Sequence, residues 1–225
     1  MAERCLLYYI TDRAQLSGGE AARHTNLRFK ISSAARAGVD YIQLREKDLS
    51  TKELEQLARE GVSRLQKLRT SRWQSKTRLL INSRVDVAIA SGADGVHLRS
   101  DDISPAVVRS IWAEANAGAS GPESREPLIA VSCHTAAEVQ RAASEGADFA
   151  VFAPVFEKND QPDQIPAGLA ALREACKAKI PVLALGGVTY ENAGSCLDAG
   201  AAGVAGIRLF QKYMIREVVR VLRAL

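Results

Sequence analysis

Four similar segments spaced 54 residues apart constrain the fold of this chain more than any other feature of its sequence. They read Gly-Val-Asp-Tyr-Ile from Gly38, Gly-Ala-Asp-Gly-Val from Gly92, Gly-Ala-Asp-Phe-Ala from Gly146 and Gly-Ala-Ala-Gly-Val from Gly200. Glycine is favoured just past the C-terminus of a helix, so each segment predicts a helix end followed directly by a buried strand. A period of 54 residues is too long for one βα unit and suits two, so four copies predict eight strands and eight helices.

Apolar runs and turn residues place the expected elements along the chain. The predicted strands are 5–11, 41–45, 78–82, 95–98, 128–132, 149–152, 181–185 and 203–207. The predicted helices include 27–37, 85–90, 136–144, 167–178 and 191–199, with Ser50 and Ser104 as the N-caps of two more. Residues 14–26 and 116–127 are expected to form polar loops. In the last helix, the residues expected to face inward are Ile215, Val218, Leu222 and Leu225. This alternation predicts one domain, residues 1–225, folded as a single (βα)8 TIM barrel, an α/β fold.

The composition is that of an ordinary globular protein, with 47% hydrophobic and 25% charged residues. No apolar run reaches the roughly 18 residues of a membrane-spanning helix, so no membrane partner is expected. The four cysteines lack the paired spacing of a disulfide framework or a zinc site, which favours a reducing, cytoplasmic location. A net charge of +4 suits anionic small molecules and is too small and dispersed to predict a nucleic-acid partner.

Polar side chains alternate at the end of the predicted strand 41–45. Gln43, Arg45 and Lys47 are two residues apart, so in an extended chain they leave the same face. Glu46 is expected to point the other way, toward the helix layer. TIM barrels build their sites at the C-terminal ends of the strands, so an amide, a guanidinium and an ammonium gathered there favour an anion-binding rim. Surface display or rim salt bridges are the alternative for these three residues.

Small residues recur where barrels frequently bind phosphate. Gly186 and Gly187 follow the seventh predicted strand, and Gly206, Ile207 and Arg208 end the eighth. Small residues at these two loops let backbone N–H groups approach a phosphate. The alternative is that these glycines are needed only for tight turns, which explains one such loop well and both loops less well. The sequence therefore predicts a phosphate site between the last two strands.

His134 is the histidine placed best for proton transfer. It follows the predicted strand 128–132 beside Ser132, and imidazole groups titrate near neutral pH, which suits acid–base chemistry. Helix capping is an equal alternative for this position. His97 lies within a predicted strand and is expected to be a hydrogen-bonded histidine of the core or rim.

An acidic pair, Asp101 and Asp102, follows the predicted strand 95–98. Carboxylates at this position suit either a metal ion or the capping of the next helix. No second acidic residue ends the predicted strand 78–82, so a magnesium site would be short of ligands.

Seven motifs together resemble the superfamily of thiamine-phosphate synthase and thiazole tautomerase, over essentially the whole chain. They are residues 9–12 (YITD), 43–47 (QLREK), 80–86 (LINSRVD), 92–98 (GADGVHL), 131–135 (VSCHT), 152–156 (FAPVF) and 184–188 (ALGGV). The resemblance implies a (βα)8 barrel that acts on a small-molecule thiazole phosphate. The family often dimerises, so the resemblance also allows a homodimer.

The synthase branch implies specific roles for several residues. Gln43, Arg45 and Lys47 would contact a pyrimidine pyrophosphate, with Asn82 nearby. Two aspartates would hold magnesium; one matches Asp102, but the other position holds a serine, Ser83.

Two further positions depart from the synthase pattern. The loop after the sixth strand has Lys158, Asp160 and Gln161 where the synthase has two threonines and a lysine. A carboxylate at position 160 would repel a pyrophosphate. Arg208 stands where a serine is expected near the phosphate site of the eighth strand, and its guanidinium can pair with phosphate directly.

These departures favour the tautomerase branch, a metal-independent isomerase that needs no cofactor. In this hypothesis His134 is the acid/base, Arg45 or Lys47 steers a carboxylate on the thiazole, and Arg208 with the last two loops holds the phosphate. The alternative is a thiamine-phosphate synthase with a modified magnesium site at Asp102. A third hypothesis is a non-catalytic paralogue that binds thiazole or thiamine phosphates.

Overall fold

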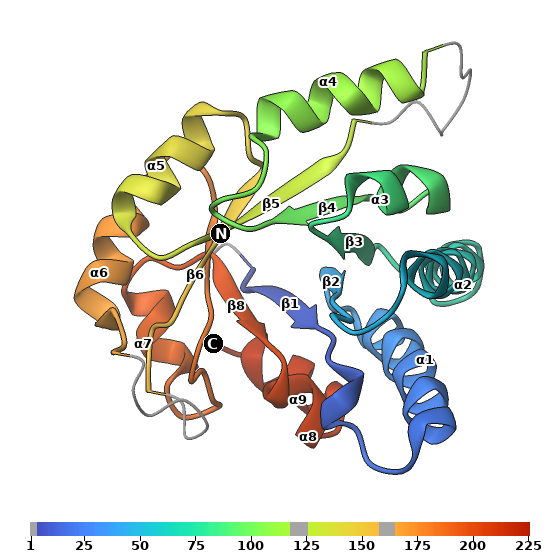
Figure 1. The fold of residues 1–225 in the computed structure, drawn as a ribbon. Coiled ribbons are helices and arrows are strands. Elements are labelled where there is room, and N and C mark those ends of the chain that lie inside the picture. Colours follow the sequence, from blue (N-terminus) through green and yellow to red (C-terminus); the bar gives the residue numbers. More distant parts are fainter. Residues whose placement is uncertain (1–3, 118–125, 158–164) are drawn as a thin grey trace.

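The computed structural model describes residues 4–117, 126–157 and 165–225, which form a closed barrel of eight parallel strands. Neighbouring strands pair in sequence order, and β8 pairs with β1 to close the ring, as Figure 1 shows. The strands are β1 (Leu6–Ile10), β2 (Tyr41–Leu44), β3 (Arg78–Asn82), β4 (Gly95–Leu98), β5 (Leu128–Cys133), β6 (Phe149–Phe152), β7 (Val182–Ala184) and β8 (Gly203–Gly206). The predicted (βα)8 barrel is therefore confirmed.

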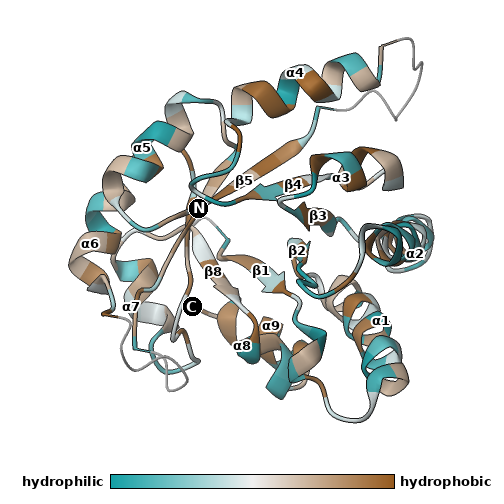
Figure 2. Cartoon of the chain, viewed as in Figure 1, coloured by the Kyte–Doolittle hydropathy of each residue, from teal (hydrophilic) through white to brown (hydrophobic). Residues whose placement is uncertain are grey.

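Helices surround the barrel on all sides in Figure 1. They are α1 (Glu20–Ala37), α2 (Thr51–Thr70), α3 (Val85–Ser91), α4 (Pro105–Ala115), α5 (Ala136–Ser144), α6 (Gly168–Ala175), α7 (Ala193–Asp198), α8 (Arg208–Lys212) and α9 (Ile215–Leu222), with a short 3-10 helix at Arg13–Gln15. Ser50 and Ser104 cap α2 and α4 as predicted, each accepting a hydrogen bond from the backbone three residues on. Figure 2 shows the amphipathic result, with apolar strands inside and hydrophilic residues on the outer faces of helices such as α2.

The 54-residue repeat has a structural meaning at the N-terminal end of the strands. All four repeat glycines adopt positive φ angles, between 67° and 100°, as expected of glycines that end helices. In three of the four copies, the aspartate two residues after the glycine lies directly before an even-numbered strand. Its carboxylate accepts a hydrogen bond from a backbone N–H of the odd-numbered strand that comes earlier in the chain. These bonds are Leu7 to Asp40 (2.8 Å), Leu79 to Asp94 (2.8 Å) and Ile129 to Asp148 (2.7 Å).

An arginine from the preceding outer helix layer completes each of these three contacts. The ion pairs are Arg223 with Asp40 (2.7 Å), Arg69 with Asp94 (2.6 Å) and Arg109 with Asp148 (3.0 Å). We call each aspartate, with its arginine and its backbone N–H, a strand clamp. The fourth copy has alanine at position 202, where the backbone carbonyl alone accepts the Leu6 N–H at 2.9 Å.

Aromatic rings fill the barrel interior. Tyr41 stacks on Phe149 with 4.8 Å between ring centroids, and Tyr8 packs edge-on against both rings. A second, larger apolar cluster fills the space between strands and helices. The interior is thus filled by side chains at this level, as in other barrels of this kind.

Two predictions about elements are wrong, and one helix was not predicted at all. Helix α1 begins at Glu20 rather than at residue 27, because Glu20 is tied to the buried Arg13 and the Arg23 side chain donates to the Leu16 carbonyl. Helix α8 was not predicted, since five residues are too few to show a period. The predicted inward residue Leu225 is 59% exposed, because α9 ends at Leu222.

Two expectations concern membrane-spanning helices and disulfide bonds. Among the helices described, none is long and apolar enough to cross a membrane. All four cysteines are free thiols.

Candidate active site

Gln43 and Asn82 meet at the ends of neighbouring strands. Gln43 is only 2% exposed, and its Nε2 donates a hydrogen bond to Asn82 Oδ1 at 2.8 Å. The parallel register between β2 and β3 pairs Gln43 with Leu80, two residues before Asn82, so the two amides lean together at the mouth. The Asn82 NH2 group keeps no protein acceptor among the described residues and is available to a ligand.

Arg45 and Lys47 extend beyond this amide pair. Arg45 is half-buried and Lys47 is exposed, and within the described residues neither side chain has a hydrogen bond or ion pair. The charge of Arg45 reaches His97 of β4 and helps to lower the pKa of that imidazole. Two cations without counter-ions at the mouth make this edge of the barrel attractive to an anion.

Glu46 points away from the mouth, as the alternation of the chain predicts. Its side chain is buried and accepts hydrogen bonds from Thr11 Oγ1 at 2.6 Å and from the Arg13 backbone N–H at 3.0 Å. The end of β2 is therefore attached to the end of β1 on the outer side, while Arg45 remains on the inner side, where its charge acts on His97.

A buried chain of hydrogen bonds runs from Tyr8 through His97 to Ser132. Tyr8 Oη lies 2.9 Å from His97 Nδ1, and His97 Nε2 lies 2.7 Å from Ser132 Oγ. Burial, with a smaller contribution from Arg45, lowers the pKa of His97 to about 3, so the imidazole is neutral. The prediction of a hydrogen-bonded histidine at position 97 is confirmed. Its partner Tyr8 was not predicted, because tyrosine in an apolar strand gives no functional signal.

The neutral imidazole has one proton, and burial decides where it lies. Tyr8 is fully buried, and His97 Nδ1 is the one acceptor within reach of its hydroxyl among the described residues. A buried O–H without an acceptor would cost about 1–3 kcal/mol, so Tyr8 donates to Nδ1. His97 Nε2 then carries the proton and donates to Ser132 Oγ, which leaves the Ser132 hydroxyl proton free to point into the mouth.

His134 lies on the loop after β5 and is exposed. Its Nδ1 donates to the Ala153 carbonyl at 2.7 Å, and its backbone N–H donates to Glu138 at 2.6 Å. The cap of α5 is Thr135, whose hydroxyl accepts the Glu138 N–H, so the capping role belongs to the next residue. The His134 ring is fixed by one carbonyl and presents Nε2 outward.

Asp102 is held by its own loop and by the β3–α3 loop. Its Oδ2 accepts from Ser83 Oγ at 2.7 Å and from the Arg99 backbone N–H at 2.8 Å, and its Oδ1 accepts from the Arg99 guanidinium at 3.2 Å. Burial alone would raise the pKa of Asp102, but these hydrogen bonds lower it below its ordinary value. Asp101 pairs with the same Arg99 at 3.4 Å.

The donor set around Asp102 does not fit a resident magnesium ion. Magnesium takes oxygen ligands, usually one or two carboxylates together with substrate phosphates. Here both oxygens of Asp102 are occupied by donors, one of them a cation. Nowhere in residues 4–117, 126–157 and 165–225 do three or more acidic, histidine or cysteine side chains gather as a metal group.

The predicted phosphate loops lie beside each other at the ends of β7 and β8. Gly186 and Gly187 have φ angles of 94° and 67°, and a Cβ on Gly187 would lie 2.5 Å from the Glu157 carbonyl oxygen. Glycine at position 187 is thus required by contact with the β6 loop. Gly206 ends β8, Ile207 is the N-cap of α8, and Arg208 is a half-buried residue of its first turn. Phosphate binding at these residues stays a prediction.

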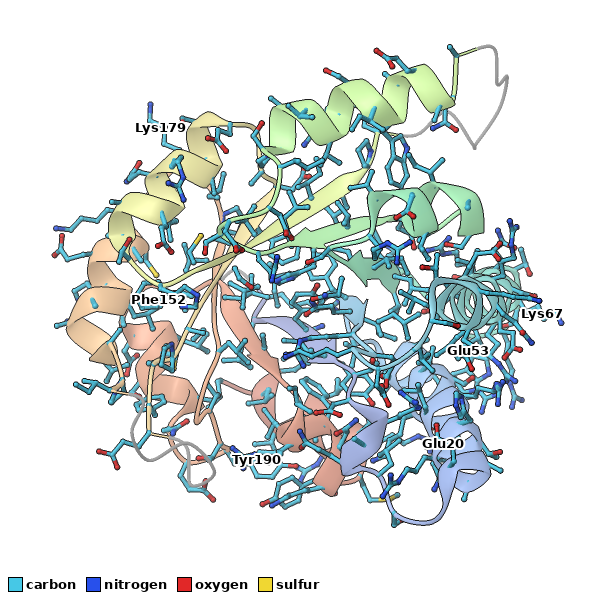
Figure 3. All side chains as sticks on the ribbon, viewed as in Figure 1. Glu20, Glu53, Lys67, Phe152, Lys179 and Tyr190 are labelled. Carbon is cyan, nitrogen blue, oxygen red and sulfur yellow. The ribbon has the colours of Figure 1, made fainter. Side chains whose placement is uncertain are left out.

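Charged side chains of the outer helix layer point into solvent. Figure 3 shows Lys67 and Lys179 extending outward at the periphery, whereas the buried Phe152 packs in the apolar layer between strands and helices. The predicted loop residues Lys158, Asp160 and Gln161 lie outside the described residues.

Comparison with known proteins gives one consistent family. The family model described as thiamine monophosphate synthase matches residues 7–210. The chain is 38% identical over 204 residues to the thiamine-phosphate synthase of a Roseiflexus species, covering 90% of this chain and 76% of the relative. It is 34% identical over 205 residues to the thiamine-phosphate synthase of Syntrophomonas wolfei, covering 89% and 86%. A solved thiamine phosphate pyrophosphorylase from Pyrococcus furiosus superposes with a TM-score of 0.75 at 27% identity, covering 99% of this chain and 95% of that one.

These findings correct one prediction. The hypothesis of a metal-independent tautomerase with His134 as acid/base is wrong, because the relatives and the solved structure are named for the synthase reaction. The intact set of Gln43, Arg45 and Lys47 therefore indicates the reaction better than the departures at Ser83 and in the β6 loop. Across almost its whole length, the chain belongs to the thiamine monophosphate synthase family.

Proposed function

We propose that this protein is a thiamine-phosphate synthase, a transferase that joins a pyrimidine pyrophosphate to a thiazole phosphate and releases pyrophosphate. A new bond forms between the thiazole and the carbon that carried the pyrophosphate, and the electron pair of the broken C–O bond leaves with pyrophosphate. The observation that carries the proposal is the inner edge of β2, where buried Gln43 meets Asn82 and leads into two cations that have no counter-ion among the described residues.

The leaving group sets the main electrostatic demand of this reaction. Pyrophosphate departs with several negative charges, which preorganised cations can stabilise. Arg45 and Lys47 supply two positive charges on one side of the mouth, and Arg208 adds a third at the start of α8. These residues, rather than a resident metal, offset the charge in the proposed mechanism, since the donors around Asp102 do not fit magnesium.

Polar groups at the base of the mouth are suited to orient the pyrimidine. Asn82 offers its NH2 group, and Ser132 offers a hydroxyl proton because His97 already donates to its oxygen. The stacked rings of Tyr41 and Phe149 lie deeper in the barrel and close its floor. Backbone N–H groups near Gly186, Gly187 and Ile207 are suited to the thiazole phosphate.

The test supplies purified protein with the two phosphorylated precursors. Thiamine phosphate is measured by chromatography and pyrophosphate by a coupled assay, with magnesium added from zero to millimolar levels or removed by chelation. We expect equal amounts of the two products, and substantial turnover after chelation. Absence of thiamine phosphate at every magnesium level would overturn the proposal.

A further inference from the structure

The segment that carries Arg45 and Lys47 is not part of the sheet. Strand β2 ends at Leu44, and the Arg45 backbone N–H donates to the Thr11 side chain at 3.0 Å instead of to a neighbouring strand. The two cations at the mouth therefore lie on a piece of chain whose conformation depends on side-chain contacts. Something other than the strand ladder must fix where they point.

Glu46 is the first of these contacts. Its two oxygens accept from Thr11 Oγ1 and from the Arg13 backbone N–H, and its side chain is 1% exposed. Because Arg45 directly precedes Glu46 in extended chain, immobilising Glu46 on the outer side directs Arg45 to the inner side, and it also fixes where the turn at Lys47 and Asp48 begins. Thr11 serves both partners, since it donates to Glu46 and accepts from Arg45.

Arg13 is the second contact and gathers three carboxylates. Its Nη1 donates to Glu46 at 3.3 Å, its Nη2 donates to Asp48 at 2.9 Å, and its Nε donates to Glu20 at 3.0 Å. The Arg13 side chain is only 5% exposed, although it follows a surface strand end. The Arg13 guanidinium thus connects the end of β1 with Glu20 at the start of α1 and with Glu46 and Asp48.

Arg13 stabilises the charged forms of its two exposed partners, whereas burial outweighs its effect at Glu46. Burial raises the pKa of Glu46, whereas hydrogen bonds from Arg13 lower the pKa of Asp48 and Glu20. Removing either partner of a buried ion pair leaves a charge without compensation, so Arg13 and Glu46 hold each other in place. Lysine cannot replace the arginine fully, because an ammonium lacks the fork that reaches three carboxylates.

We propose that Arg13 is a positioning residue for the anion-binding rim: it fixes the segment 46–48 from behind and thereby holds Arg45 and Lys47 at the mouth for a pyrophosphate group. The identity of that group rests on the proposed function. Arg13 itself touches no ligand, since its guanidinium is committed to the outer side of the segment.

Inorganic pyrophosphate binding, measured by calorimetry, tests the proposal without turnover. Arg13→Gln and Glu46→Gln are expected to weaken binding by about tenfold or more, as a small displacement of positioned groups does. Arg13→Lys is expected to fall between these variants and the native protein, and Arg45→Gln gives the loss caused by removing one rim cation. In turnover, Arg13→Gln should raise KM for the pyrimidine pyrophosphate more than it lowers kcat.

Arg69→Gln is the matched control. Arg69 pairs with Asp94 at the opposite end of the barrel, so its loss lowers stability without touching the mouth, and pyrophosphate binding should stay as in the native protein. Unchanged affinity in Arg13→Gln and Glu46→Gln overturns the proposal, as does an equal loss in Arg69→Gln or a native protein that binds no pyrophosphate. Arg13-dependent pyrophosphate binding without thiamine phosphate formation would instead overturn the proposed function and leave the positioning role standing.

Discussion

Arg69 Nη2 lies 2.6 Å from Asp94 Oδ2 at the N-terminal end of the strands, and the same oxygen accepts the Leu79 backbone N–H at 2.8 Å. Asp94→Ala would remove the carboxylate that accepts the Leu79 N–H and would leave Arg69 with the Thr77 carbonyl, at 3.0 Å, in place of its ion pair. We expect the free energy of unfolding to fall by about 2 kcal/mol, because hydrogen bonds to a charged group contribute more than neutral ones. Urea denaturation measures this change.

The exposed pair between Arg84 and Asp86 provides the comparison. Asp86→Ala removes a carboxylate whose side chain is 64% exposed, and such pairs contribute less than about 1 kcal/mol. Similar losses of stability in the two variants would contradict a special role for the strand clamp.

His97 predicts a pH dependence of stability. Its pKa is about 3 in the folded protein and near 6.5 when unfolded, so the unfolded chain binds more protons as the pH falls. Stability associated with His97 is therefore complete above pH 6.5 and is lost progressively as the pH falls from 6.5 toward 3. Between pH 6.5 and 5 the expected loss is about 1.5 kcal/mol. Urea denaturation of the native protein and of His97→Asn at these pH values should show a flatter dependence in the variant; parallel curves would count against it.

The Tyr8 hydroxyl is expected to set the tautomer of His97. Nitrogen NMR should find the ring proton of His97 mainly on Nε2 in the native protein. In Tyr8→Phe, Nδ1 of His97 loses the hydroxyl that donates to it, so the ring proton can move from Nε2 to Nδ1. Ser132 can then donate its hydroxyl proton to Nε2, and this proton no longer points into the mouth. We expect kcat/KM for thiamine phosphate formation to fall by about tenfold, the value of one misplaced hydrogen bond. Unaltered NMR shifts in Tyr8→Phe would exclude this coupling.

Ser83→Asp should create a metal site that the native residues do not form. Ser83 Oγ is 2.7 Å from Asp102, so an aspartate there would place two carboxylates together, and a divalent cation would relieve their repulsion. The φ angle of Ser83 is 54°, a conformation that aspartate tolerates better than most residues. Manganese binding, followed by the loss of the free-ion EPR signal, should be tighter in Ser83→Asp than in the native protein. Ser83→Ala serves as the control, and tight binding by the native protein would refute the expectation.

Much of the barrel could be predicted because its signals are local. A glycine after a helix adopts positive φ whatever surrounds it, so Gly38 and Gly92 marked helix ends reliably. The start of α1 could not be predicted in this way, since Glu20 is held by Arg13 through a contact that only the folded chain forms. The same limit applies to Ala153, whose carbonyl, just after the end of β6, fixes the His134 ring.

The site was predicted in part for a related reason. The alternation of side chains at the end of β2 correctly predicted that Glu46 and Arg45 point to opposite sides, because this periodicity is a property of the extended backbone. Reaction type depends on groups contributed by several loops, so reading single departures such as Ser83 led to the wrong branch. The hydrogen bonds of Asp102 explain how a serine is accommodated there, and they become visible only when the β3 and β4 loops meet.

Arg223 and Asp40 give the barrel a property that the linear chain conceals. Arg223 follows the last helix and clamps β1 and β2, just as Arg69 clamps β3 and β4. It also donates to the Cys5 carbonyl, so Cys5 and Arg223 are neighbours although 218 positions separate them. One of the three clamps thus joins the first described strand to the last described helix across the closure of the ring. New termini opened between α2 and β3, with residues 4 and 225 joined by a short linker, should yield a circular permutant with the same barrel and the same mouth.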